Sequence, residues 1–124
     1  MIKFGVLMYD SKLRDLSTDF SVDIINLVKL LKSNHESVIA NQIGRSATSI
    51  GANIYEAQYA QSTNDFISKL EIALKECYES EYWLELLFET GYVEEERFLS
   101  LHNSGGALRR MLISSLNTIK QKNT

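Results

Sequence analysis

The feature that most limits how this chain can fold is the absence of proline from a sequence whose apolar residues recur every three or four positions. Proline and glycine are the strongest breakers of helices, and only six glycines occur among 124 residues. An apolar spacing near 3.6 residues gathers those side chains on one face of a helix, whereas a strand requires alternation. The sequence therefore predicts an all-α protein.

Four amphipathic helices account for almost the whole chain, at about residues 11–32, 36–60, 63–90 and 93–120. Ser62 and Asp65 form a capping box before the third helix, and Gly91 suits a left-handed cap after it. Long helices joined by short turns are typical of an antiparallel up-down-up-down four-helix bundle. We predict one domain over residues 1–124, in which residues 1–10 either extend the first helix or form an N-terminal arm.

Each predicted helix has one apolar stripe for the shared core. The four stripes are Leu13, Leu16, Phe20, Ile24, Leu27 and Leu31; Ile39, Ile43, Ala47, Ile50, Ile54 and Ala57; Phe66, Leu70, Ala73, Cys77, Leu84 and Phe88; and Phe98, Leu101, Leu108, Leu112, Leu116 and Ile119. The single cysteine lies on a stripe and is expected to be a buried, inert thiol.

No apolar run reaches the roughly 20 residues of a membrane span, and no signal peptide is evident, so a cytoplasmic location is expected.

Motifs of the common enzyme classes fit the sequence poorly. A di-iron bundle uses Glu-x-x-His pairs, but Lys32 precedes His35 by three residues and Leu99 precedes His102. The stretch from Gly44 to Gly51 lacks the Gly-Lys-Ser/Thr ending of a phosphate loop. We expect no catalytic residues, no metal site and no cofactor.

The second helix has two further faces beside its core stripe. One flank carries Gly44, Thr48, Gly51 and Tyr55, and the other carries Gln42, Arg45, Ser49, Asn53 and Glu56. Glycine within a helix costs roughly 1 kcal/mol relative to alanine, so the small flank suggests close packing against another backbone. The alternative is that the glycines only mark a weak helix.

The third helix also has a second apolar face, formed by Ile72, Tyr82, Trp83 and Leu86 around Glu79. A helix that is apolar on two sides needs two partners, and a bundle core supplies one. The patch therefore suggests self-association, with harmless surface aromatics as the alternative. A buried Glu79 would need a cation, for which Arg45 is the candidate, within or between subunits.

Basic residues gather near the end of the chain, at Arg109, Arg110, Lys120 and Lys122. Either they complement the dipole at the end of the fourth helix, or they form a nucleic-acid contact. The formal net charge is -3, and residues 62–91 hold two basic against seven acidic residues, which does not favour a duplex-binding protein.

Three stretches, "QIGRSATSIGANIYEA", "NDFISKLEIALKECYESEYWLELLFETGY" and "RRMLISSLNTIK", together resemble the four-helix-bundle proteins encoded in bacterial 23S rRNA intervening sequences, often labelled S23 ribosomal protein. The matching positions are Gln42, Arg45, Ala47, Ser49, Ile50, Ala52, Asn53, Ile54, Glu56, Phe66, Leu70, Ala73, Leu74, Glu79, Glu81, Leu84, Gly91 and Tyr92. The chain departs from the family pattern at Gly44 for arginine, Gly51 for proline, Ala57 for glycine, and Lys75 with Glu76 for a pair of small residues.

The resemblance implies a left-handed four-helix bundle that assembles as a homopentameric ring. The accessory variability determinant of diversity-generating retroelements is similar in architecture and binds a reverse transcriptase and nucleic acid through a basic surface. The family has no settled biochemical role, and the resemblance implies that Arg45, Asn53 and Glu56 act at helix and subunit contacts. Our leading hypothesis is a non-enzymatic oligomeric scaffold built through the second and third helices. The alternative is a nucleic-acid-binding accessory protein that uses a basic face of the ring.

Overall fold

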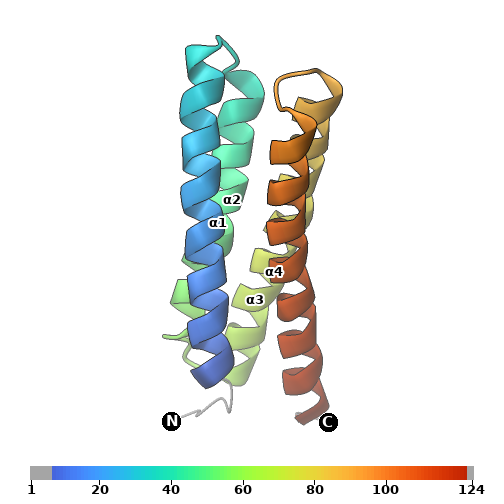
Figure 1. The fold of residues 1–124 in the computed structure, drawn as a ribbon. Helices are drawn as coiled ribbons and strands as arrows, with labels where there is room; N and C mark the ends of the chain where they lie inside the picture. Colours follow the sequence, from blue (N-terminus) through green and yellow to red (C-terminus); the bar gives the residue numbers. More distant parts are fainter. Residues whose placement is uncertain (1–6, 123–124) are drawn as a thin grey trace.

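The computed structural model describes residues 7–122, with side chains described from residue 12 onward. Its described part forms four helices, α1 (Leu7–Ser33), α2 (Val38–Ala57), α3 (Thr63–Glu89) and α4 (Glu95–Lys122). Successive helices run in opposite directions, and Figure 1 shows the start of α1 and the end of α4 at the bottom of the molecule. Each helix contacts its two neighbours in the cyclic order α1, α2, α3, α4. The predicted all-α, up-down-up-down bundle is confirmed.

The core runs the length of the bundle and receives fully buried side chains from every helix, among them Leu27, Ile43, Leu70 and Leu108. Three residues of the predicted stripes, Leu16, Ile39 and Phe98, are only partly buried and pack against its edge. Near the end of α3 the sequence prediction was wrong by one position. Leu87 is fully buried, whereas Phe88 is half-buried and stacks on Phe98 with ring centroids 4.4 Å apart. A fixed apolar spacing drifts around a long straight helix, which explains the shift.

The helix boundaries differ from the predicted ones by a few residues. Residues 7–10 belong to α1, which favours the helix extension, and residues 1–6 lie outside the described part. Helix α2 begins at Val38, not at residue 36, and the Glu36 carboxylate accepts a hydrogen bond from the Ala40 N–H at 2.8 Å. It ends at Ala57 because the N–H groups of residues 58–60 donate to carbonyls three residues back, in a tighter turn.

The turns follow known capping chemistry. Ser62 Oγ accepts from the Asp65 N–H at 3.0 Å, which confirms the predicted cap, and the Asp65 carboxylate accepts from the Gln61 N–H. Gly91 has a φ of 82°, and the N–H groups of Gly91 and Tyr92 donate to Phe88 and Leu87 carbonyls in a Schellman motif. The same motif ends α1, where the left-handed position is His35, with a φ of 65°.

The contact between α2 and α3 is the most extensive in the bundle. The buried hydroxyls of Ser46 and Ser80 lie 2.8 Å apart across it and form a hydrogen bond. Small residues of both helices, such as Ala47 and Ala73, are also buried, which allows the two helices to pack closely. This pairing fixes how the outer faces of α2 and α3 meet.

Candidate interaction surface

A charged cluster joins the outer faces of α2 and α3. Arg45 Nη1 donates to Glu76 Oε2 at 3.3 Å, and Arg45 Nη2 donates to the Glu79 carboxylate. Trp83 Nε1 donates to the same Glu79 oxygen at 2.9 Å. The predicted pairing of Arg45 with Glu79 is confirmed, within one chain. The second acceptor, Glu76, was missed, although it precedes Glu79 by three residues and therefore shares its face of the helix.

The cluster is a surface feature with a structural consequence. Half of the Arg45 side chain is exposed, so each of its ion pairs contributes about 1 kcal/mol or less. Without Arg45, however, Glu76 and Glu79 would face each other as like charges one turn apart. The guanidinium therefore holds two α3 carboxylates and, through Glu79, the indole of Trp83 in one arrangement.

The apolar face predicted on α3 is only partly exposed, and its two exposed side chains lie about 15 Å apart along the helix. Ile72 and Tyr82 are 40% and 53% exposed, whereas Trp83 and Leu86 are half-buried. Trp83 packs against the core, and the Tyr82 ring meets its edge at a centroid distance of 5.1 Å. We call the exposed pair, Ile72 and Tyr82, the α3 patch.

Only part of the predicted polar row on α2 reaches α3. Glu56 pairs with Lys69 of α3 at 3.2 Å, so Glu56 and Arg45 connect the two helices at two levels. Asn53 instead donates to the Ser49 carbonyl at 2.8 Å and to Ser49 Oγ at 3.2 Å, which are bonds within α2.

Two of the four predicted nucleic-acid contacts are paired with glutamates of α3. Arg109 Nε donates to Glu81 at 2.8 Å, and its guanidinium lies 5.7 Å from the centre of the Tyr78 ring. The hydrogen bond to Glu81 raises the pKa of Arg109. Lys120 Nζ pairs with Glu71 at 2.8 Å. The sequence revealed the acidic excess of residues 62–91, but not that it lies against these cations.

The remaining two cations do not join them on one face. Arg110 and Lys122 are exposed. Since residues follow one another at about 100° around a helix, Lys122 lies about 200° from Lys120. Arg109 and Lys120 therefore share the face of α4 that meets α3, whereas Arg110 and Lys122 point away from that face and from each other.

A shallow, open groove between α1 and α2 was not predicted. Its volume is about 470 Å³, and it is lined by Arg14, Thr18, Ser21, Val22, Thr48, Gly51, Ala52 and Tyr55. The signal for it was the small flank of α2, which lies against α1. A methyl group at Gly51 would meet only Ser21 and Ser17 at ordinary distances of 3.5 and 3.6 Å, and one at Gly44 would meet Val28 at 3.4 Å. Packing within one chain therefore does not require either glycine.

The described part of the chain offers little support for a metal site, a reactive thiol or a membrane span. Residues 12–122 contain no cluster of three or more His, Cys, Asp or Glu side chains that could hold a metal ion. Cys77 is buried, as predicted, and burial raises the pKa of its thiol to about 12. No helix between residues 7 and 122 combines the length and the apolar character of a membrane span.

Comparison with known proteins gives one family match and a close structural likeness. The model of the family described as 23S rRNA-intervening sequence protein matches residues 10–114. A crystal structure from Bacteroides thetaiotaomicron, described as a protein of unknown function from the S23 ribosomal protein family, superimposes with a TM-score of 0.85 at 50% sequence identity. The match covers 87% of this chain and 97% of that one. A search of curated proteins finds no match.

Proposed function

The chain belongs to the 23S rRNA-intervening sequence protein family, and from this premise we propose that it is a non-enzymatic scaffold that assembles with copies of itself through the outer face of α2 and α3. The observation that carries the proposal is the α3 patch. Helix α3 is already buried along its core face, and Ile72 and Tyr82 leave a second apolar surface without cover. Apolar surface beside an ordered polar rim is a common mark of an interface.

The cluster beside the patch supports a structural role. The charges of Arg45, Glu76 and Glu79 are paired with one another, and the Trp83 indole is held by one of them. Such an arrangement holds the surface in one shape before binding. Little side-chain entropy is then lost when another folded surface docks on it, which favours binding. We propose five copies, the number that the family resemblance implies, and a cytoplasmic location, in which a lone buried thiol such as Cys77 stays reduced.

Size-exclusion chromatography with light scattering tests the proposal. The wild type is expected to have a mass several times 14.1 kDa. Tyr82→Arg should reduce that mass because it places a charge in the α3 patch. Leu99→Arg is the matched control, since Leu99 is similarly exposed but lies on α4. A wild type with the mass of one chain at all concentrations would refute self-assembly.

The alternative, nucleic-acid contact through the basic residues of α4, has weaker support because Arg109 and Lys120 are paired with glutamates. A gel-shift assay with structured RNA at low salt tests it. We expect no shift. A shift that weakens with salt and is lost in Arg110→Glu would favour the nucleic-acid function instead.

A further inference from the structure

A closed ring of identical subunits needs two different surfaces on each subunit, because every copy meets one neighbour with each. The α3 patch is one of them. We propose that the second is the groove between α1 and α2 together with the exposed apolar residues of α1 next to it, and that a second copy of this chain docks its α3 patch there. The inference rests on the proposed self-assembly and assigns its complementary surface.

The receiving surface is apolar and concave. Val22 lines the groove and is 51% exposed, and Ile25, one turn further along α1, is 42% exposed. Gly51, which has no side chain, and Ala52, which has only a methyl group, also line it from α2 and leave space for a side chain from outside. Tyr55 forms part of the α2 side and stays half exposed. Nothing in residues 12–122 covers this surface.

The α3 patch and the groove lie at matching heights in the bundle. The contacts of Ser80 with Ser46 and of Lys69 with Glu56 set the register of α3 against α2, and place Ile72 level with Asn53. Gly51 is close to this level and faces Ser17 and Ser21 of α1. A copy displaced sideways, without moving along the helix axes, would therefore bring its Ile72 to the groove.

The same comparison of heights pairs Tyr82, the second residue of the α3 patch, with Ile25, the second exposed apolar residue of α1. Tyr82 is ten residues from Ile72, or about 15 Å along the helix at 1.5 Å per residue. The register of α2 on α3 places Tyr82 level with Ile43, and Gly44 faces Val28 of α1. In a neighbouring copy at the same height, Tyr82 would thus reach the stretch of α1 that begins at Ile25.

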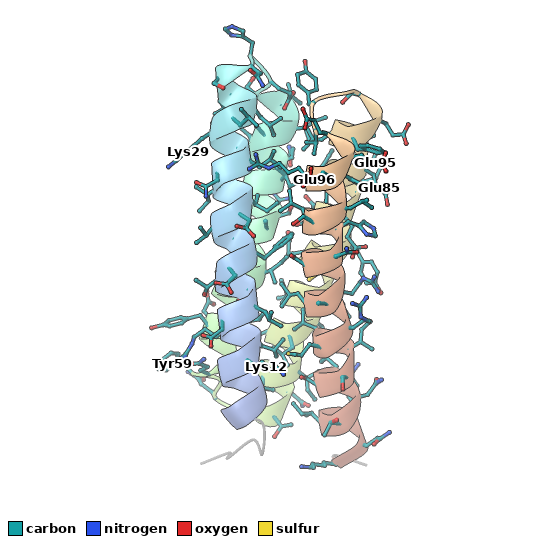
Figure 2. The ribbon with its side chains drawn as sticks, viewed as in Figure 1. Lys12, Lys29, Tyr59, Glu85, Glu95 and Glu96 are labelled. Carbon is teal, nitrogen blue, oxygen red and sulfur yellow. The ribbon has the colours of Figure 1, made fainter. Side chains whose placement is uncertain are left out.

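The charges at this level are also complementary. Lys29 and Glu85 are exposed, and neither forms an ion pair with any other residue between 12 and 122. Figure 2 shows Lys29 projecting from α1 on the left of the molecule and Glu85 lying on the right, at similar heights. When copies are placed side by side, Glu85 of one therefore approaches Lys29 of the next.

The positions of the two surfaces favour a ring over a straight filament. The groove lies between α1 and α2, and Ile72 lies on the α3 face that the Arg45 cluster joins to α2. Both surfaces are thus displaced toward α2. Successive copies then turn toward the α2 side, as closure about an axis requires.

The test uses one variant of each surface and their mixture. Ile72→Arg disrupts the patch, and Ala52→Arg fills the groove from an exposed position that leaves the core untouched. Each variant alone should lose the large assembly. An equal mixture should form a dimer and nothing larger, because the intact groove of one variant accepts the intact patch of the other. Leu99→Arg is the control and should assemble as the wild type does.

The outcomes separate the inference from the proposed function. A monomeric wild type would refute both. If the wild type assembles and Ala52→Arg assembles equally well, the groove is not the receiving surface, although self-assembly stands. If both variants lose assembly and their mixture stays monomeric, the patch does not dock in the groove.

Charge reversal provides an independent check. Lys29→Glu and Glu85→Lys should each raise the subunit dissociation constant by roughly tenfold, and the chain with both changes should return close to the wild-type value. Lys12→Glu, on the same helix, is the control and should have no effect. Additive losses in the double variant would overturn the proposed contact of Lys29 with Glu85.

Discussion

Burial controls the chemistry of Cys77, the one thiol of the chain. Its pKa rises from 9.0 to about 12, mainly because the thiolate would lose its hydration, with a smaller effect of the nearby Glu81 charge. In the unfolded chain the thiol ionises near its ordinary pKa, so the free energy of unfolding should fall as the pH rises from about 9 toward 12.

Urea denaturation of the wild type and Cys77→Ala at pH 7.5 and pH 10.5 measures this effect. The wild type should lose more stability than the variant over the interval. Equal losses would mean that Cys77 does not remain protonated in the folded chain.

His35 adopts a backbone conformation that favours glycine. Its φ of 65° is that of the left-handed region, where a residue with a Cβ is strained by roughly 1 to 2 kcal/mol. Glycine removes the strain but adds freedom to the unfolded chain, so His35→Gly should stabilise the protein by about 1 kcal/mol. Chemical denaturation measures this. A destabilised variant would indicate that the His35 side chain makes a contact worth more than the strain.

At the scale of single helices, the type and number of elements could be predicted because amphipathic spacing is continuous over 20 or more residues. Caps such as Ser62 and Gly91 could be predicted because their chemistry is local. The start of α2 could not, since it depends on a bond from the Ala40 N–H to the side chain of Glu36. The pairing of Arg45 with Glu79 could be predicted because a half-buried carboxylate needs a cation and few were available.

Helix propensity can be tested at Gly44, where a methyl group would meet Val28 at an ordinary 3.4 Å. Gly44→Ala should therefore stabilise a single chain by up to about 1 kcal/mol. Thermal melting at concentrations too low for assembly measures this. A lower melting temperature would restore the interpretation that glycine is needed there for close packing.

The contact between α2 and α3 can be tested at Arg45. Arg45→Ala should lower stability by about 1 kcal/mol, because it removes two exposed ion pairs and leaves Glu76 and Glu79 as neighbouring like charges. Trp83 is the only tryptophan, so its fluorescence reports directly on the cluster. Arg97→Ala, at an exposed position of α4, is the control. An unchanged melting temperature together with an unchanged emission spectrum would contradict a structural role for Arg45.

At the scale of the whole molecule, the bundle could be predicted, but the distribution of charge over its surface could not. The sequence shows four cations near the end of the chain. Their spacing shows that they do not all share one face of a helix, but which of them meet an acidic partner depends on how α4 is rotated against α3. That rotation turns Arg109 and Lys120 toward Glu81 and Glu71. The groove between α1 and α2 was missed for the same reason, since it is a property of two helices together.

The most direct test of the account is the mass of the wild-type assembly by native mass spectrometry, over a range of protein concentrations. The account predicts a complex of five chains of 14.1 kDa each, without a continuous series of larger species. A single chain at every concentration would contradict it, and would leave the α3 patch and the groove as surface features of a monomer.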